Sequence, residues 1–203
     1  HPRVRRQRQM CIRDRKYIEL VENTLKNSGA LYYVYAGTLL GLTREGKFIS
    51  WDRDIDYAVV ITQDFPWSKL ESLMNKSGFK KTREFVFEGS VKEQSYAVGK
   101  MNIDFFGQFY EDTHMIQYSF EYIPNCEYND ENERSVYLVT LPKVVETKKI
   151  RMGKVSVSVP VNSEELLAAI YNEDWRIPNP NWKSNSGKCS VLLKNKVAHQ
   201  VVL

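Results

Sequence analysis

Hydrophobic and polar positions along the chain follow two periods, one of three to four residues and one of two. The longer period predicts amphipathic helices, and Ser28-Gly29 and Gly78 end the first two of them. The predicted helices cover residues 12–27, 66–76 and 164–171, with a shorter one at 38–42.

Runs rich in β-branched and aromatic residues predict the strands. These runs cover residues 31–35, 57–61, 79–88, 95–99, 101–110, 115–122, 135–141 and 148–159, with a hairpin at 152–154 in the last. Between them, residues 89–94 are predicted as a hairpin turn and the polar residues 125–134 as an exposed loop. We therefore predict an α/β (α+β) fold, a mixed β-sheet with flanking helices.

Three acids alternate with other residues just before the apolar run 57–61: Asp52, Asp54 and Asp56. In a strand, residues two apart share a face. Asp54 and Asp56 should therefore point the same way, and Asp52 joins them if the strand starts that early. Like charges at the mouth of a buried strand repel one another unless a cation holds them. Oxygen ligands favour a divalent metal, Mg²⁺ or Mn²⁺.

A fourth acid, Asp104, stands alone in the apolar run Met101–Phe106. Unpaired Asp is rarely buried. A neighbouring strand that brings Asp104 beside Asp54 and Asp56 would complete a three-carboxylate site, with Asp104 also a candidate base. Such sites serve phosphoryl or nucleotidyl transfer.

The acidic run has two other interpretations. A calcium-binding loop needs Gly at its sixth position and Glu at its twelfth, where this chain has Tyr57 and Gln63. A solvated, acidic strand end is the more general alternative. The apolar continuation after Asp56 and the isolated Asp104 both disfavour it.

Residues upstream of the acids are candidates for holding phosphate. Gly37 and Thr38 start the short predicted helix, and free N–H groups at a helix start attract anions. Arg44 and Lys47 lie on the predicted link to the acidic strand and could bind phosphate oxygens. An ordinary helix start and a solvated loop are the plainer interpretations of these residues.

Taken together, the stretch from Gly37-Thr38-Leu39-Leu40-Gly41 through Arg44 and Gly46–Ile49 to Trp51–Asp56 resembles the signature of the LicD/fukutin-related family. That family belongs to the nucleotidyltransferase superfamily. The preceding helix, Asp104 and the segment 171–178 also fit it, although Thr43, Glu45, Ser50 and Arg53 differ from residues that the family often carries.

The resemblance implies a metal-dependent phosphotransferase. A phospho-alcohol, such as phosphocholine or ribitol phosphate, would pass from a CDP-linked donor (CDP-choline or similar) to a glycan hydroxyl, as in the modification of cell-surface polysaccharides. Asp54, Asp56 and Asp104 would be the catalytic metal ligands. Gly37, Thr38, Arg44, Lys47 and Asp52 would bind substrate. A transferase that adds a nucleoside monophosphate to a small molecule, and a non-catalytic binding module, stay open as alternatives.

Composition narrows the remaining choices. The chain has 203 residues, 42% of them hydrophobic, and a formal net charge of +4. Basic residues concentrate near the start, so residues 1–14 are predicted as a basic disordered tail and 15–203 as a single domain. The rest is close to neutral, which disfavours nucleic-acid binding and leaves membrane contact at most peripheral.

The three cysteines, at positions 11, 126 and 189, form no zinc-binding motif and suggest no disulfide framework. No signal peptide and no transmembrane run is evident in the sequence. These observations favour a reducing, cytoplasmic location.

Overall fold

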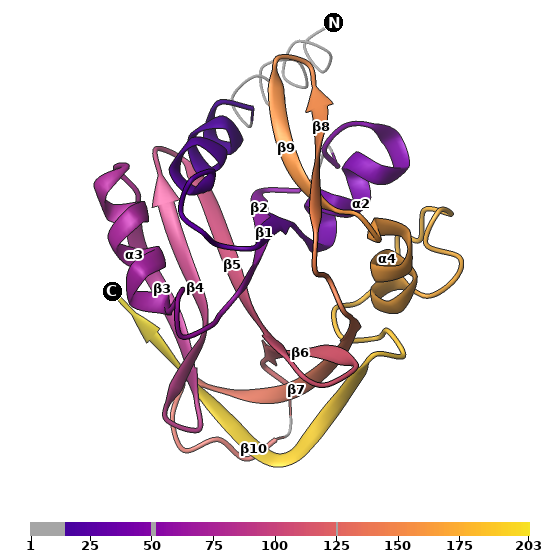
Figure 1. Cartoon of the computed structure of the whole chain (residues 1–203). Coiled ribbons are helices and arrows are strands. Elements are labelled where there is room, and N and C mark those ends of the chain that lie inside the picture. Colours follow the sequence, from indigo (N-terminus) through magenta and orange to yellow (C-terminus); the bar gives the residue numbers. More distant parts are fainter. Residues whose placement is uncertain (1–14, 50–51, 125) are drawn as a thin grey trace, which may run out of the picture.

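The structure is a computed structural model that describes residues 15–49, 52–124 and 126–203 (Figure 1). The predicted basic tail at 1–14 lies outside the described residues. Within them the helices are residues 15–25, α2 (Ala36–Glu45), α3 (Trp67–Lys76) and α4 (Ser163–Tyr171). No helix in this part of the chain is long and apolar enough to span a bilayer.

Ten strands accompany these helices in the described ranges. They are β1 (Tyr32–Val34), β2 (Asp54–Val60), β3 (Lys80–Phe87), β4 (Ser90–Val98), β5 (Met101–Tyr110), β6 (His114–Glu121), β7 (Glu133–Pro142), β8 (Thr147–Met152), β9 (Val155–Pro160) and β10 (Ser190–Val202). The mixture of helices with a large mixed sheet confirms the predicted α/β (α+β) class.

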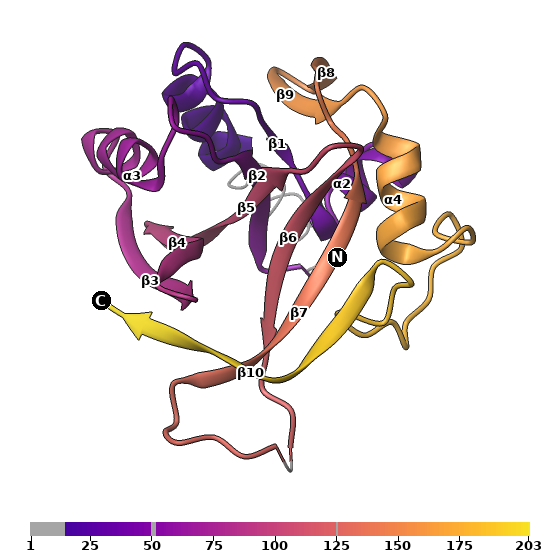
Figure 2. The same ribbon diagram turned by 60° about the horizontal axis from the view of Figure 1, so that its bottom comes forward.

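Eight strands form one sheet in the order β1-β2-β5-β4-β3-β10-β7-β6, and β8 and β9 form a separate hairpin. β2 and β5 run parallel, whereas the other neighbouring pairs are antiparallel. The first part of β5 pairs with β4 and its last three residues pair with β6. Because β5 pairs with both β4 and β6, six of the strands close into a ring, in the order β5-β4-β3-β10-β7-β6. Figure 2 shows β10 crossing from the α4 side of this ring to the β3 side.

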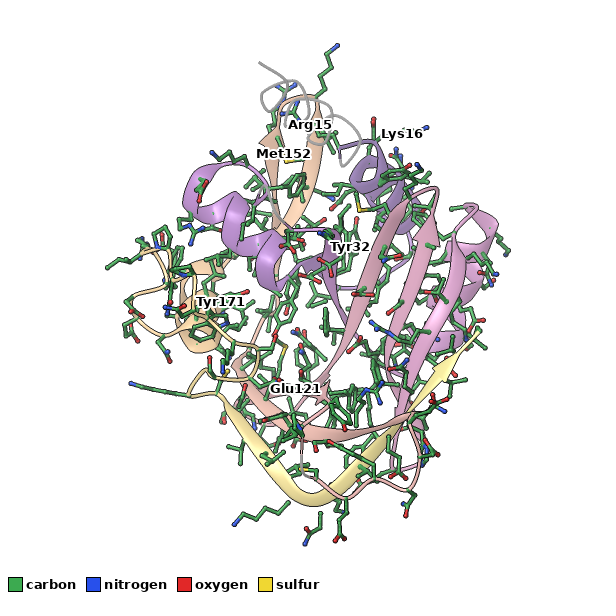
Figure 3. All side chains as sticks on the ribbon, turned by 180° about the vertical axis from the view of Figure 1, so that it is seen from behind. Arg15, Lys16, Tyr32, Glu121, Met152 and Tyr171 are labelled. Atoms are coloured by element: carbon green, nitrogen blue, oxygen red, sulfur yellow. The ribbon has the colours of Figure 1, made fainter. Side chains whose placement is uncertain are left out.

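The main hydrophobic cluster draws on most elements, from the first helix to the segment after α4. Ile18, Val21 and Leu25 of the first helix are at most 1% exposed, so its predicted apolar stripe is the buried one. With all side chains drawn, Figure 3 shows them filling the space between helices and sheet.

Three sequence predictions need correction. The predicted turn at 89–94 was wrong, because β4 begins at Ser90 and the turn is Glu88-Gly89, with φ of 49° and 73°. The predicted helix 38–42 is α2, which extends to Glu45, so Arg44 lies in its last turn and not on a link. The strand β10 was not predicted at all. Most of its side chains are exposed and its pairing with β7 shifts register after Leu192, which leaves no regular alternation to detect.

Candidate metal and phosphate site

Three carboxylates gather where the chain enters β2. One side-chain oxygen from each of Asp52, Asp54 and Asp56 lies within 4.8 Å of the others. β2 begins at Asp54, so Asp54 and Asp56 share a face through strand alternation. Asp52 precedes the strand and reaches the same place from the loop.

Asp104 lies on the neighbouring strand β5, in register with Asp56. Paired strands run about 4.8 Å apart, and residues in register point to the same side of the sheet. The structure thus brings the isolated acid of β5 next to the acidic end of β2. The parallel register of β2 and β5 causes this, because it places Asp54 beside Asn102 and Asp56 beside Asp104.

Crowding of these acids disfavours their charged forms. Burial, followed by the charge of Asp54, raises the pKa of Asp56 well above its usual range, and Asp104 and Asp52 add to the effect. Burial and then the hydrogen bond and charge of Asp54 raise the pKa of Asp52 to about 7. In the described part of the chain, no Lys or Arg forms an ion pair with Asp52, Asp54 or Asp56. Clustered carboxylate oxygens without a protein cation are the ligand set that a hard divalent ion takes.

Asp104 differs from the other acids because protein groups partly neutralise it. Burial raises its pKa, while a hydrogen bond from Ser95 and the charge of Arg83 lower it. The Arg83 guanidinium lies 3.6 Å from Asp104 and 3.5 Å from Glu93, and it donates to Ser95 Oγ at 3.0 Å. Burial and the charge of Asp104 raise the pKa of Glu93 to about 8.

The sequence patterns did not predict the group formed by Arg83, Glu93 and Ser95. Ser95 is in register with both Arg83 and Asp104, so the three residues form a row across β3, β4 and β5. The wrong hairpin turn at 89–94 hid this row, because it started β4 at Ser95 and so gave no correct register between β3 and β4. It also placed Glu93 outside any strand. The alternation of Glu93 with Ser95 was the available signal.

The N-terminus of α2 lies against the acids. Gly37 and Thr38 are in its first turn, and the N-cap residue Tyr35 makes no side-chain capping hydrogen bond. Ala36 starts the helix with φ of 42°, a conformation that costs a non-glycine residue free energy and that clusters at functional sites. This helix start therefore directs N–H groups and the positive end of the helix dipole toward the acidic cluster.

Gly37 and Thr38 each have a structural partner in that cluster. A Cβ on Gly37 would lie 2.5 Å from Asp52 Oδ2, so a larger residue would displace that carboxylate. The Thr38 hydroxyl accepts a hydrogen bond of 3.0 Å from the backbone N–H of Asp56. Both residues thus hold α2 and the acids in contact.

Arg44 and Lys47 are farther along the chain and bind the same glutamate. Arg44 Nη2 lies 2.9 Å from Glu45 Oε1, and Lys47 Nζ lies 3.3 Å from Glu45 Oε2. The Arg44 side chain is only 10% exposed, whereas that of Lys47 is 65% exposed. Arg44 faces the cavity described next, and Lys47 is not among its lining residues.

A cavity of about 570 Å³ opens beside the acids, between α2 and the segment 171–182. Gly37 and Arg44 line it from α2, and Tyr171, Trp175 and Trp182 line it from the other side. Burial, followed by the charges of the neighbouring acids of the cluster, raises the pKa of Tyr171. Trp175 is 5% exposed and belongs to the main core cluster. The sequence patterns did not single out Trp182.

A mixed sheet with facing carboxylates on two parallel strands, beside an uncapped helix start, defines a nucleotidyltransferase-like domain. The family model described as "LicD/FKTN/FKRP, nucleotidyltransferase domain" matches residues 29–162, more than half of the chain. The chain belongs to this family, which confirms the resemblance noted in the sequence and identifies a transferase-type domain. No curated protein matches the chain significantly. The cavity wall at 171–182 lies beyond the matched residues.

Proposed function

We propose that the chain is a metal-dependent phosphotransferase that moves a phospho-alcohol, of the phosphocholine or ribitol-phosphate kind, from a CDP-linked donor to a glycan hydroxyl. The observation that carries this proposal is the gathering of Asp52, Asp54 and Asp56 beside Asp104, with no ion pair from a described Lys or Arg to the first three. Membership of the family supports transferase activity. The CDP-linked donor and the glycan acceptor are proposed in addition.

Asp54, Asp56 and Asp104 would hold Mg²⁺ or Mn²⁺, with Asp52 in support. When bound, the cation would neutralise phosphate oxygens and favour ionisation of the acceptor hydroxyl. The first turn of α2 would bind the donor diphosphate through the N–H groups of Gly37 and Thr38. Positioning and charge neutralisation provide most of the acceleration in such transfers.

Two basic side chains, Arg44 and Lys47, would also act on the donor diphosphate. Arg44 is nearly buried, faces the cavity and retains N–H donors beyond those given to Glu45, so it can bind a donor oxygen. Lys47 would contribute only a screened charge, because its side chain is mostly exposed. We therefore assign Arg44 the stronger role.

The test replaces Asp54 or Asp56 by Ala and measures transfer from CDP-choline, CDP-ribitol and CDP-glycerol with Mg²⁺. Each variant should lose transfer by roughly a thousandfold, the scale of removing a main electrostatic contact, and should keep its fold. The control is Asp64→Ala, an acid away from the site. Metal-dependent transfer retained in both site variants would falsify the assignment.

Product analysis separates the proposal from the transfer of a nucleoside monophosphate, which the word "nucleotidyltransferase" in the family description keeps in view. Release of CMP with a phospho-alcohol on the acceptor supports the proposal. Release of pyrophosphate with a nucleotide on the acceptor supports the rival. Mg²⁺-dependent thermal stabilisation by a donor with no turnover on any acceptor supports a binding module.

A further inference from the structure

Three segments that are distant in the sequence meet at one end of the molecule. They are the first helix (residues 15–25), the turn between β4 and β5 at Gly99-Lys100, and the turn between β8 and β9 at Gly153. A Cβ on Gly99 would lie 2.5 Å from Tyr17 Oη, and a Cβ on Gly153 would lie 3.0 Å from Arg15 Nη1. Both turns therefore pack against the start of the first helix, and Figure 1 shows all three segments at the same end.

Each of these segments carries basic side chains. We call the set the basic end, and its members are Arg15, Lys16, Lys100, Arg151 and Lys154. The last four are exposed, and Arg15 is half-buried against the β8–β9 turn. Figure 3 shows Arg15 and Lys16 beside this turn, which Met152 marks. The fold thus gathers cations from separate parts of the sequence on one surface.

The protein leaves the charges of the basic end unpaired. Among residues that the structure describes, no acid forms an ion pair with any of the five. Arg15 Nε is buried and has no hydrogen-bond partner within the same residues. The exposed acid Glu19 lies one helical turn after Arg15 and Lys16, so cations outnumber it on this surface. An excess of unpaired cations attracts anions.

The arrangement of these cations suits many anions on a surface better than one small anion. The side chains come from two turns and a helix start, so they extend from separate points. A surface cluster of about four to eight Lys or Arg is typical of proteins that bind anionic lipid. The sequence adds to the charge, because residues 1–14 hold five Arg against one acid and join the described chain at Arg15.

We infer that the basic end is a docking surface for an anionic lipid bilayer, where its Lys and Arg side chains bind headgroup phosphates. The attraction is electrostatic, so salt weakens it. Met101 follows Lys100 and lines a small cavity with Asp52 and Asp54. Docking therefore holds the acidic cluster near the bilayer surface. The inference is independent of the proposed function, because docking requires no turnover.

The test measures sedimentation of the full chain with lipid vesicles in the absence of Mg²⁺. Vesicles of phosphatidylcholine with about one third phosphatidylglycerol are anionic, and vesicles of phosphatidylcholine alone are not. The native chain should bind the anionic vesicles at least about tenfold more tightly, and NaCl raised from about 0.05 M to about 0.5 M should remove this preference. The combined variant Lys16→Gln, Lys100→Gln and Lys154→Gln should weaken binding about 100-fold, since each cation near such a surface contributes about fivefold.

The matched control removes three exposed lysines elsewhere, in the combined variant Lys69→Gln, Lys143→Gln and Lys194→Gln. Lys143 Nζ lies over the Tyr110 ring, at the end of β5 farthest from Lys100. The net charge falls equally in both variants, but the control should change vesicle binding by less than about twofold, because its lysines lie away from the docking surface. Thermal denaturation checks that both variants are folded.

The inference is overturned if the basic-end variant binds anionic vesicles within about twofold of the native chain, or if the control loses as much binding. Binding to soluble polyphosphate without binding to anionic vesicles would also overturn it, and would make the basic end a site for a polyanionic chain. The transfer assay uses soluble donors and no vesicles. It therefore tests the proposed function separately, whichever way the vesicle result falls.

Discussion

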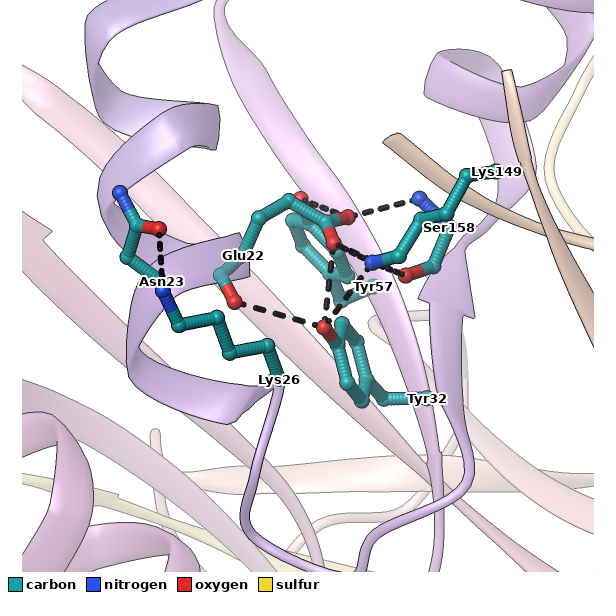
Figure 4. Close-up of polar contacts among 7 residues, drawn as sticks. All are labelled: Glu22, Asn23, Lys26, Tyr32, Tyr57, Lys149 and Ser158. Carbon is teal, nitrogen blue, oxygen red and sulfur yellow. Dashed lines mark hydrogen bonds and ion pairs between the residues drawn. The ribbon is translucent and has the colours of Figure 1, made fainter. Parts of the chain in front are cut away.

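Two acidic sites lie against opposite faces of β2, one formed by Glu22 and one by the aspartate cluster, and they differ in how their charges are met. Glu22, on the first helix, is saturated with donors (Figure 4). Its carboxylate accepts from Tyr32 Oη at 3.0 Å, from Tyr57 Oη at 3.3 Å and from the backbone and side chain of Ser158 at 2.8 Å each, and Lys149 Nζ forms an ion pair with it. This network ties the first helix to β1, β2 and the β8–β9 hairpin.

Asp56 precedes Tyr57 on β2 and therefore points to the opposite face of the sheet. There the neighbours of Asp56 are other acids, and its charged form is disfavoured. A buried charge is stable when it is paired and hydrogen-bonded, and costly when it is not. One face of β2 thus uses an acid for stability, and the other keeps acids unpaired, as a site for a cation requires.

The largest expected effect is that substitutions at the two acidic sites change the free energy of unfolding in opposite directions. The measurement is urea denaturation in EDTA. Glu22→Gln should lower the unfolding free energy by about 2–3 kcal/mol, because Lys149 loses its partner and the new amide meets the donors of Ser158. Asp56→Asn should raise it by about 1 kcal/mol, because a crowded like charge disappears. Equal losses in both variants would contradict the contrast.

The second prediction concerns pH. The unfolded-state pKa values of Asp52 and Asp56 lie near 3.8, and folding raises both, that of Asp52 to about 7. Between these values the folded protein binds more protons than the unfolded one, so stability falls as pH rises. Asp52 is only partly buried and solvent screens its charge, so metal-free protein should lose about 2 kcal/mol between roughly pH 4 and pH 7, less than the full pKa shift implies.

Saturating Mg²⁺ should flatten this pH dependence, because the cation favours the ionised acids. Asp52→Asn should reduce the slope in EDTA, and Glu22→Gln should preserve it at a lower stability. The measurement is a series of denaturation curves across this pH range. An unchanged slope in Asp52→Asn would mean that another group titrates.

The aspartate cluster could be predicted from the sequence, whereas the hydrogen-bond network around Glu22 could not. Asp54 and Asp56 stood out because they alternate with other residues just before an apolar run, and alternation alone assigns them to one face. Asp104 stood out because it is the single acid within an apolar run. Glu22 falls on the same helix face as the buried Ile18 and Leu25, so its position was a signal, but its partners were not predictable. Ser158 and Lys149, which complete its hydrogen bonds, lie more than a hundred residues later in the chain.

The same limit explains the other omissions. The register of β3, β4 and β5 decides that Arg83 and Ser95 lie beside Asp104, and register is a long-range property. The cavity likewise depends on how the segment 171–182 folds back on α2. Local patterns therefore gave the chemistry of the acids, while the groups that orient and flank them required the three-dimensional pairing.

A smaller effect should separate the two glycines of α2. Gly37→Ala should weaken Mg²⁺ binding about tenfold, because the new Cβ displaces the Asp52 carboxylate. The side chain can yield, so stability should change by less than about 1 kcal/mol. Gly41→Ala is the matched control: its Cβ would lie 2.7 Å from the Lys47 carbonyl oxygen, so this variant should lose stability. Unaltered Mg²⁺ affinity in Gly37→Ala would remove Asp52 from the site.

The smallest effect concerns Arg83, a cation that borders the acidic group. Arg83 lies 3.6 Å from Asp104, and its charge opposes a divalent ion bound nearby. Arg83→Met should therefore tighten Mg²⁺ binding by about threefold, a modest gain because the guanidinium is partly exposed and screened by solvent. Lys196→Met removes an exposed cation paired with Glu88 on the surface and should leave Mg²⁺ affinity unchanged. Calorimetric titration of both variants measures the difference. Weaker binding in Arg83→Met would show that Arg83 orients Asp104 for the ion and that the acidic group, like Glu22, depends on a protein cation.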